Sequence, residues 1–366
     1  MYRFYMPTKV IAGEGCVLKN GKEIAELGKK AMVVTGKNSG RKSGALQDVL
    51  DVLNEYQMEY EIYDRIENNP TLDCVVEAGI KARSWQPDLI IGIGGGSPLD
   101  AAKAIAVLAN NDIPGMDLYN GNYPNKPLPI VAIPTTAGTG SEVTPYAVLT
   151  LKDIESKKGF TSEQVFPKVA FLDAVYTEML PHDVTVHTAV DALSHALEGF
   201  TATRSSVSTD YIALEAIKLF ADCMPQLKIG DLSLVEREKL LRASMLAGIV
   251  IAHTGTTIVH SMGYSLTYFR NIPHGKANGL LLAEYLRFLE EFAMGKVNEV
   301  LEALQIETID AFAQQMTKLL DDNTRLLPEE IEKYVSISIQ ATNSIHNTLG
   351  NVTKDQQMRM FTESLG

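Results

Sequence analysis

Cysteine is scarce and long apolar runs are missing, and each shortage excludes a class of protein. The three cysteines, Cys16, Cys74 and Cys223, are far apart and odd in number, which disfavours a disulfide framework and favours a reducing compartment. No apolar stretch approaches the ~20 residues of a membrane-spanning helix. The first residues, MYRFYMPTKVIAGEG, lack the charged stretch and apolar core of a signal peptide. We therefore expect a cytoplasmic protein with no membrane partner.

Positive charge is also in the minority. Lysine and arginine total 33 and aspartate and glutamate total 45, which gives a formal net charge of −12. No basic cluster stands out, so nucleic acids and anionic membranes are poor partners for this chain. The 366 residues correspond to about two domains at roughly 150 residues each.

The first part of the chain alternates short β-branched runs with helical patterns. Such alternation is typical of βαβ units and of a parallel sheet covered on both faces. Strands are predicted at residues 31–35, 60–63, 88–93 and 129–134, and helices at residues 43–56, 71–84 and 100–108. Residues 2–5 and 9–12 are predicted to form a small antiparallel addition.

After about residue 181 the strand patterns stop. Helices are predicted at residues 187–202, 208–224, 232–253, 257–266, 275–292 and 298–304, with shorter amphipathic helices over residues 308–365. Residues 245–260 are apolar nearly all round, which indicates a helix buried in a bundle. We therefore expect an α/β domain over residues 1–180, followed by an all-helical domain over residues 181–366.

A run of three glycines at residues 94–96 follows the strand predicted at residues 88–93. Glycines have no side chains, so a phosphate can approach the backbone closely. Ser97 suits an N-cap and Pro98 the first helical position, and Asp100 completes the pattern of a capping box. We therefore predict a helix whose N-terminal amides face a pyrophosphate. A tight turn without a ligand is the alternative.

A second loop of small residues, PTTAGTGSEVT at residues 134–144, follows the next predicted strand. Its hydroxyls and accessible amides suit the ribose, phosphate and amide groups of a nucleotide. Both loops follow the carboxyl ends of predicted parallel strands, where the ligands of open α/β sheets bind. A polar turn before another strand is the alternative.

The helical part contains a candidate metal-binding set. Asp191 and His195 are spaced i,i+4, which places both side chains on one face of a helix. His260 and His274 supply two more imidazoles, and a carboxylate with three imidazoles suits Fe²⁺ or Zn²⁺. Taken singly, a histidine on an apolar face is more often a hydrogen-bonded core residue, and the i,i+4 pair could be a helix-surface hydrogen bond. The remaining histidines without such spacing are expected to be structural: His182, His187, His253 and His346.

Together these segments resemble the iron-dependent (group III) alcohol dehydrogenase family of the dehydroquinate synthase-like superfamily. The resemblance covers essentially the whole chain and implies a Rossmann-like nucleotide-binding α/β domain followed by an all-α metal-binding and catalytic domain. It rests on five motifs in the family's order: GGGSPLDAAKAIA at residues 94–106, PTTAGTGSEVTPYAV at 134–148, VAFLD at 169–173, VDALSHALEGF at 190–200, and VHSMGYSL with IPHGKANGLLL over 259–282.

The resemblance also implies roles for individual residues. It implies that the metal, Fe²⁺ or Zn²⁺, is bound by Asp191, His195, His260 and His274. It implies that NAD(P) is contacted, from the pyrophosphate to the nicotinamide side, by Gly94, Gly95, Gly96, Ser97, Asp100, Thr135, Thr136 and Thr139. Further cofactor contacts match less closely at Asn69 and at Lys157 or Lys158.

Two positions depart from the family pattern. Many members carry a histidine four residues after the third ligand, where this chain has Tyr264. A proton relay through that histidine is therefore not expected, and a tyrosine hydroxyl could replace it in part.

Members that prefer NAD tend to carry an aspartate after the strand at residues 31–35, where this chain has Gly36. The residues that follow offer cations and a hydroxyl: Lys37, Ser39, Arg41 and Lys42. A basic, glycine-rich loop suits a 2′-phosphate, which predicts NADP(H) over NAD(H); a solvated turn is the alternative.

We therefore predict a metal-dependent, NAD(P)-linked alcohol dehydrogenase or aldehyde reductase acting on a primary alcohol or a small diol. A polyol dehydrogenase or a hydroxyacid–oxoacid transhydrogenase on the same scaffold is the alternative, and a non-catalytic nucleotide-binding protein is an alternative of another class. Because short N-terminal strands would leave a sheet edge exposed, and such edges tend to pair, we also predict a homodimer.

Overall fold

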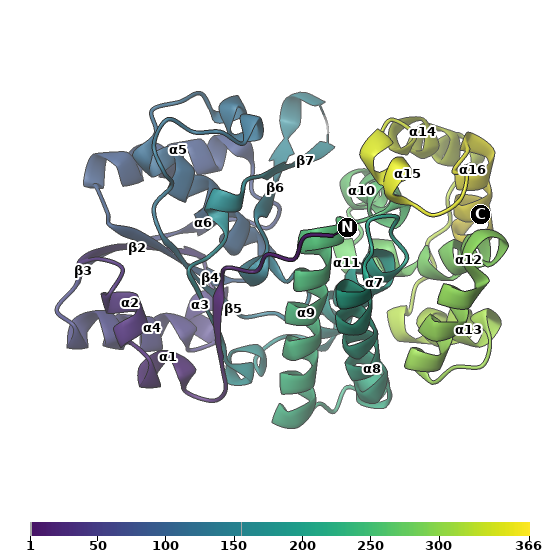
Figure 1. The fold of residues 1–366 in the computed structure, drawn as a ribbon, viewed down its shortest axis with the longest axis horizontal. Helices are drawn as coiled ribbons and strands as arrows, with labels where there is room; N and C mark the ends of the chain where they lie inside the picture. Colours follow the sequence, from purple (N-terminus) through teal and green to yellow (C-terminus); the bar gives the residue numbers. More distant parts are fainter. Residues whose placement is uncertain (1, 155) are drawn as a thin grey trace. The chain divides into compact units, whose positions relative to one another are not determined.

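The computed structural model describes residues 2–154 and 156–366, which divide into two compact units (Figure 1). The first, Met6–Leu180, is the α/β unit. The second, the helical unit, consists of Pro181–Gly366 together with residues 2–5.

The α/β unit is built on a parallel sheet, as the alternating pattern predicted. Among the described residues, six strands pair in the order β1-β8-β5-β4-β2-β3, and every pairing is parallel. Their bounds are Lys9–Ala12 (β1), Lys30–Gly36 (β2), Glu59–Ile66 (β3), Leu89–Gly94 (β4), Ile130–Pro134 (β5) and Val169–Leu172 (β8). A separate antiparallel hairpin joins Tyr146–Leu151 (β6) and Ser156–Thr161 (β7).

The prediction of an antiparallel addition at the N-terminus is wrong. Strand β1 pairs in parallel with β8, with Lys9 opposite Val169, and residues 2–5 form no strand. These first residues instead contact the helical unit, where the Phe4 ring stacks on His253 and the Tyr5 amide donates to its Nε2. A four-residue apolar pattern fixes the spacing of a strand but not the direction of its partner, which explains the error.

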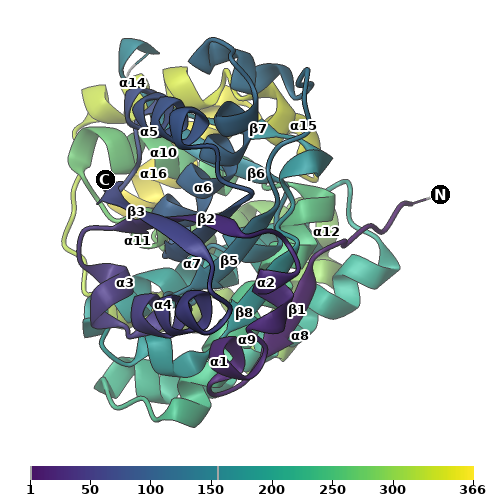
Figure 2. The same cartoon turned by 90° about the vertical axis from the view of Figure 1, so that its left-hand side faces the viewer.

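Helices cover both faces of the sheet (Figure 2). Ile90 of β4 faces one apolar cluster, which includes α5 (Leu72–Trp85) and α6 (Gly96–Asn110), whereas Leu89, Ile91 and Ile93 face a second cluster on the other side. The second cluster includes α1 (Cys16–Lys19), α2 (Lys22–Ala25) and α4 (Ala45–Glu55); the short helix α3 spans Ser39–Lys42. All six residues of β4 are buried, which is why this strand reads as a continuous apolar run.

The helical unit contains most of the helices that the sequence predicted after residue 181, but the single buried helix expected at residues 245–260 is wrong, because one helix ends at Thr254 and the next begins at Ile258. Their bounds are His182–Phe200 (α7), Val207–Ile229 (α8), Leu234–Thr254 (α9), Ile258–Arg270 (α10), His274–Gly279 (α11), Leu282–Leu304 (α12), Ile309–Leu320 (α13), Pro328–Ser338 (α14), Thr342–Asn347 (α15) and Lys354–Leu365 (α16). The single helix predicted at residues 275–292 is wrong, because the chain turns between α11 and α12. Gly275 and Gly279 lower the helix propensity there. Helix α12 also has a non-helical residue at Ala293, within the gap left between two predicted helices.

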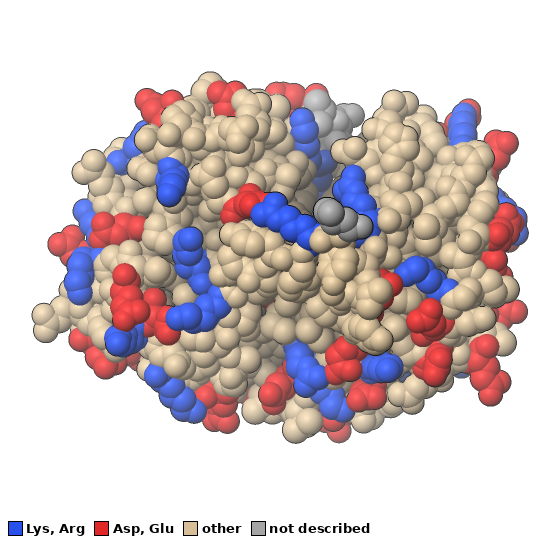
Figure 3. All heavy atoms as spheres, in the orientation of Figure 1, with Lys and Arg blue, Asp and Glu red and all other residues tan. Residues whose placement is uncertain are grey.

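The described residues show no single helix that is both long and apolar enough to cross a membrane; the pair α9 and α10, bent by 112°, passes the same test together. Cys16, Cys74 and Cys223 are all free thiols. On the face in Figure 3, cationic and anionic side chains are interspersed rather than gathered by sign.

Candidate functional site

Helix α7 carries the first two members of the candidate metal set. Asp191 and His195 lie one turn apart on it, and both are buried, at 3% and 6% exposure. Helix α7 also packs against α9 and α8, so its inner face is shielded from water. The i,i+4 spacing therefore directs a carboxylate and an imidazole to the same buried face.

Helix α11 brings His274 to α7 by a close backbone approach. A Cβ on Gly275 would lie 1.9 Å from the carbonyl oxygen of His187 and 2.8 Å from Cβ of Asp191. A Cβ on Gly279 would lie 2.5 Å from Cγ1 of Val190. Because these glycines are spaced i,i+4, they form one smooth face that rests on α7. The glycines thus determine how near His274 comes to Asp191.

The four side chains converge in the helical unit. Nε2 of His260 lies 3.7 Å and Nε2 of His274 lies 3.8 Å from Oδ1 of Asp191. The rings of His195 and His260 stack at 4.6 Å between centroids. One donor atom from each of Asp191, His195 and His260 lies within 4.8 Å of the others. The ring of Tyr264 stacks on His274 at 5.5 Å, so Tyr264 borders this cluster.

A residue that the sequence analysis missed orients His260. Glu198 is fully buried, and its Oε1 contacts Nδ1 of His260. Its Oε2 accepts hydrogen bonds from the amide and the hydroxyl of Thr257, at 2.7 and 2.6 Å. The Tyr285 hydroxyl lies 3.1 Å from the hydroxyl oxygen of Thr257. A signal was present, because Asp191, His195 and Glu198 are spaced i, i+4 and i+7 and so share a helix face.

Two carboxylates give the cluster negative charge. Burial alone would raise the pKa of Asp191, but the imidazoles of His195, His274 and His260 outweigh it and hold that pKa below its usual value. Burial likewise opposes ionisation of Glu198, but the attraction and hydrogen bond of His260 lower its pKa. Both carboxylates are therefore ionised at neutral pH, which suits the binding of a cation.

Asn278 shows where the acceptors of the cluster point. Its side-chain nitrogen lies 3.1 Å from Oδ1 of Asp191, 3.1 Å from Nε2 of His260 and 3.4 Å from Nε2 of His274. Gly263 leaves room for this side chain, because a Cβ there would lie 2.1 Å from Oδ1 of Asn278. The carboxylate oxygen and the two imidazole nitrogens thus direct their lone pairs toward one electropositive group, the side-chain NH₂ of Asn278. Such an arrangement fits a divalent metal with carboxylate and imidazole ligands.

Two loops of the α/β unit lie in direct contact: residues 94–96, here called the glycine run, and residues 134–144, here called the threonine loop. Strands β4 and β5 are neighbours, and the Thr135 amide donates to the Gly94 carbonyl at 2.9 Å. A Cβ on Gly95 would lie 3.1 Å from Oγ1 of Thr136, and one on Gly96 would lie 2.7 Å from Cγ2 of Thr139. Because these two glycines have no side chains, the threonines fit against them and the helix amides remain accessible.

The capping box predicted at Ser97 and Asp100 is wrong. Helix α6 begins at Gly96, its N-cap is Gly95, and no side chain caps it. Asp100 instead accepts hydrogen bonds from the Ser141 hydroxyl at 2.6 Å and from the Val148 amide at 2.8 Å. Asp100 thus binds residues that are distant in sequence, although its local spacing from Ser97 predicted a role in capping the helix.

Ser97, Asn69 and Lys157 meet beside the glycine run. Oγ of Ser97 accepts a hydrogen bond from the Asn69 amide at 3.1 Å, and Nζ of Lys157 donates to Oδ1 of Asn69 at 2.6 Å. Lys158 lies elsewhere, with its ammonium 4.8 Å from the centroid of the Tyr119 ring. Of the two lysines that matched the family's cofactor contact, Lys157 is therefore the one that lies beside the other predicted cofactor residues.

Strand β2 ends at Gly36, next to β4 in the sheet. Gly36 is buried, whereas Lys37 and Ser39 are exposed. Arg41 is exposed as well and lies 3.4 Å from a carboxylate oxygen of Asp64. The loop therefore presents its cations at the same edge of the sheet as the glycine run.

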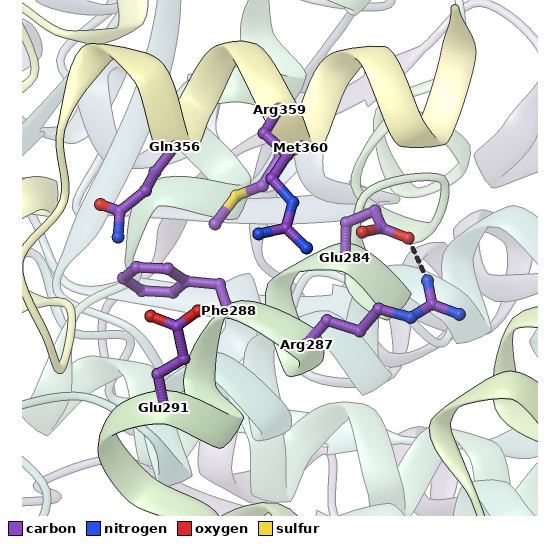
Figure 4. A pocket seen from close by; sticks show the side chains of 7 residues that line it. All are labelled: Glu284, Arg287, Phe288, Glu291, Gln356, Arg359 and Met360. Carbon is purple, nitrogen blue, oxygen red and sulfur yellow. Dashed lines mark hydrogen bonds and ion pairs between the residues drawn. The ribbon is translucent and has the colours of Figure 1, made fainter.

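Figure 4 shows a pocket between α12 and α16, lined by Glu284, Arg287, Phe288, Glu291, Gln356, Arg359 and Met360. Arg287 is paired there with Glu284. None of the lining residues belongs to the carboxylate–imidazole cluster, so this pocket is not part of the candidate metal site.

The α/β unit has a parallel sheet with small-residue loops at its carboxyl edge, and the helices that follow it in the chain bring together a carboxylate and imidazoles. These two features define a metal-dependent enzyme of the nucleotide-binding α/β class. Comparison with known proteins narrows this class. Residues 7–174 match the model for iron-containing alcohol dehydrogenases, and residues 185–359 match the C-terminal model of the Fe-containing alcohol dehydrogenase family.

Relatives match over most of their length. The chain is 36% identical to sulfoacetaldehyde reductase of Bilophila wadsworthia over 75% of this chain and 71% of the relative. It is 31% identical to NADPH-dependent butanol dehydrogenase of Clostridium saccharobutylicum, over 92% and 85%. The crystal structure of an iron-containing alcohol dehydrogenase from Thermotoga maritima superimposes with a TM-score of 0.93 at 40% identity, covering 100% of both chains. The chain belongs to the iron-containing alcohol dehydrogenase family. It is an oxidoreductase that acts on CH–OH groups, with a metal site at Asp191, His195 and His260.

Proposed function

We propose that this dehydrogenase interconverts a primary alcohol or a small diol with its aldehyde, using Fe²⁺ and preferring NADP(H). The names of its relatives support a small substrate. Lactaldehyde reductase of Escherichia coli is 33% identical and 1,3-propanediol dehydrogenase of Klebsiella pneumoniae is 35% identical. The observation that carries the metal-dependent part is the convergence of three acceptor atoms, from Asp191, His260 and His274, on one point.

Asp191, His195, His260 and His274 would hold the metal, with His274 as the fourth ligand. The bound ion supplies Lewis acidity toward the oxygen of the alcohol or aldehyde. Glu198 accepts from Nδ1 of His260 and so keeps the Nε2 lone pair free to bind. Fe²⁺ is the proposed ion, and the same ligands suit Zn²⁺ as well.

The α/β unit would hold the nucleotide. The bare backbone of the glycine run and the N-terminal amides of α6 suit the pyrophosphate, while Thr135, Thr136 and Thr139 offer hydroxyls toward the nicotinamide side. Asn69, Ser97 and Lys157 form a polar group next to that run. Asp100 would act indirectly, because its oxygens hold Ser141 and Val148.

The NADP preference rests on the end of β2. Gly36 offers no carboxylate to repel a 2′-phosphate, and Lys37 beside it is exposed and has no hydrogen bond or ion pair with any described residue. Ser39 adds a hydroxyl. Arg41 contributes less charge, because Asp64 is close to it.

The decisive test is metal analysis of the anaerobically purified protein, combined with an activity screen. Straight-chain alcohols, diols and aldehydes are each assayed with NADP(H) and with NAD(H). We expect close to one iron per chain and turnover of small substrates that favours NADP(H). Reduction of an oxoacid without added nucleotide would instead establish a transhydrogenase, and a preference for longer polyols would establish a polyol dehydrogenase.

We further propose that the protein is a homodimer. Strand β1 is an edge strand that pairs with β8 on one side, and exposed sheet edges tend to pair with another chain. Light scattering at micromolar concentration should give a mass near twice 40.1 kDa. A particle of 40.1 kDa would refute the dimer.

A further inference from the structure

His274 is the most exposed of the four proposed metal ligands. Its side chain is 27% exposed, whereas the side chains of His260 and Asp191 are 4% and 5% exposed. It is also the first residue of α11, a helix of six residues, and helix ends fray. Gly275 and Gly279 hold the backbone of α11 against α7, but that packing does not set the rotation of the imidazole about its side-chain bonds. The orientation of this ligand therefore depends on the side chains around it.

Two rings hold the imidazole of His274. The ring of Tyr264 stacks on it, with 5.5 Å between centroids and 18° between planes. The ring of His260 meets it edge-on, at 5.1 Å and 73°. Both rings come from α10, where the spacing i,i+4 places them on one face of the helix. Contact with one ring along its face and with another along an edge restricts how the imidazole can turn while its Nε2 lies 3.8 Å from Oδ1 of Asp191.

Each of the two histidines brought to α7 from other helices thus has its own supporting side chain. Glu198 orients His260 through the contact of its carboxylate with Nδ1. We propose that Tyr264 is the positioning residue for His274, and that its stacked ring holds the imidazole with Nε2 directed at the metal. This inference rests on the proposed function, in which His274 is the fourth metal ligand.

An aromatic side chain suits this role for two reasons. Rings with centroids about 4.5–7 Å apart attract each other beyond the effect of the area they bury. When a cation binds at Nε2, the imidazole also becomes poorer in electrons, and such a ring is attracted more strongly to the electron-rich face of its neighbour. The stack therefore stabilises the metal-bound form of His274 more than the metal-free form, which connects Tyr264 to metal affinity.

The test measures metal affinity rather than turnover. Tyr264→Leu keeps an apolar side chain and removes the stack, whereas Tyr264→Phe keeps the ring and removes only the hydroxyl. Tyr268→Leu is the matched control, because Tyr268 lies one turn later on α10, is half-buried like Tyr264, and has its ring edge-on to Phe269 at 5.0 Å. Competition with a chelator gives the Kd for Zn²⁺, which suits the same ligands as Fe²⁺ and has no redox chemistry.

We expect Tyr264→Leu to weaken Zn²⁺ binding by about two- to tenfold, which corresponds to the loss of one aromatic pair. Tyr264→Phe and Tyr268→Leu should keep the wild-type Kd. In a His274→Ala background, Tyr264→Leu should have no further effect, because the residue through which it acts is gone. If Tyr264→Leu fails to fold, Tyr264→Met takes its place as the variant without a ring.

The absorption spectrum of the Co²⁺-loaded protein separates positioning from a purely structural role, because it depends on the geometry of the ligands. It should change in Tyr264→Leu and remain that of the wild type in Tyr264→Phe. Loss of stability alone would lower the Tm and leave the spectrum unchanged.

An unchanged Kd for Zn²⁺ in folded Tyr264→Leu would overturn the inference. So would an equal loss in Tyr264→Phe, or a further loss when Tyr264→Leu is added to His274→Ala. Failure of the proposed function has a different signature. Wild-type protein that binds no metal, or His274→Ala with the wild-type Kd, would overturn the assignment of the ligands themselves.

Discussion

Glu198 and His260 are joined through a buried contact between Oε1 of the carboxylate and Nδ1 of the imidazole. The contact fixes the proton of His260 on Nδ1 and leaves Nε2 to face Asp191, 3.7 Å away. The carboxylate is itself held by two hydrogen bonds from Thr257. The orientation of one metal ligand is therefore set by residues of α7 and of the turn before α10.

Replacing His260 with alanine should remove the metal and nearly all turnover. The substitution takes away one of the converging donor atoms and leaves the nucleotide loops of the α/β unit unchanged. Metal analysis should give far less than one ion per chain, while titration with NADPH should give the wild-type Kd. Removal of the metal with a chelator should reproduce this behaviour in the wild type. A variant with wild-type turnover in metal-free buffer would contradict the metal assignment.

Glu198→Gln should weaken metal binding by about 10- to 100-fold, the range typical of partners that orient a metal ligand. Glutamine cannot accept from both His260 and Thr257, and it removes one negative charge beside the cluster. Metal affinity measured by competition with a chelator checks this directly. Tyr285→Phe is the control, because it removes only the outer hydroxyl of the same network. An equal loss in both variants would show that the network acts through stability alone.

Gly36→Asp should reverse or flatten the preference for NADP(H), because its carboxylate would repel the 2′-phosphate. The position is crowded, since a Cβ there would lie 3.2 Å from Oγ of Ser39 and 3.3 Å from the Ile66 carbonyl. Gly36→Ala therefore serves as the control for crowding and should affect both nucleotides equally. The measurement is kcat/KM with each nucleotide at fixed ionic strength. Equal or better use of NAD by the wild type would contradict the proposed preference.

Gly96→Ala should weaken nucleotide binding by about tenfold or more, because forced contacts of this kind cost about 1–3 kcal/mol. The new Cβ would lie within 3.2 Å of all three heavy atoms of the Thr139 side chain, Cβ, Oγ1 and Cγ2, so rotating that side chain gives no relief. Gly295→Ala on α12 is the matched control, since a Cβ there has open space around it. The nucleotide Kd of both variants is the measurement. An unchanged Kd in Gly96→Ala would show that the threonine loop does not need this contact.

The sequence predicts features that depend on local spacing. The alternation of strands and helices predicted a parallel sheet, and the i,i+4 spacing of Asp191 and His195 placed two site residues on one buried face. His260 was predicted from its residue type and from family resemblance, because no local pattern connects it to α7. Features that depend on distant partners were missed or wrong. Glu198 contacts a residue 62 positions away, and Asp100 matched a local capping pattern while its hydrogen bonds lie 41 and 48 positions away.

The same limit applies to backbone direction. The apolar pattern of residues 9–12 indicated a strand, but only the position of β8 determines that β1 runs parallel to it. Gly275 and Gly279 reduce helix propensity in the sequence, yet their packing against His187 and Val190 is visible only once α7 and α11 are in place.

The attachment of residues 2–5 to His253 has a consequence for dividing the protein into expressible pieces. The helical unit is not contiguous in sequence, because residues 2–5 belong to it as well as residues 181–366. A fragment that starts at residue 181 therefore lacks the Phe4 ring and the Tyr5 amide that cover this histidine. Such a fragment would leave the His253 ring without its stacking partner and its Nε2 without the Tyr5 amide. Appending the first residues to its C-terminus through a flexible tether, or supplying them as a synthetic peptide, would be the rational way to obtain it in isolation.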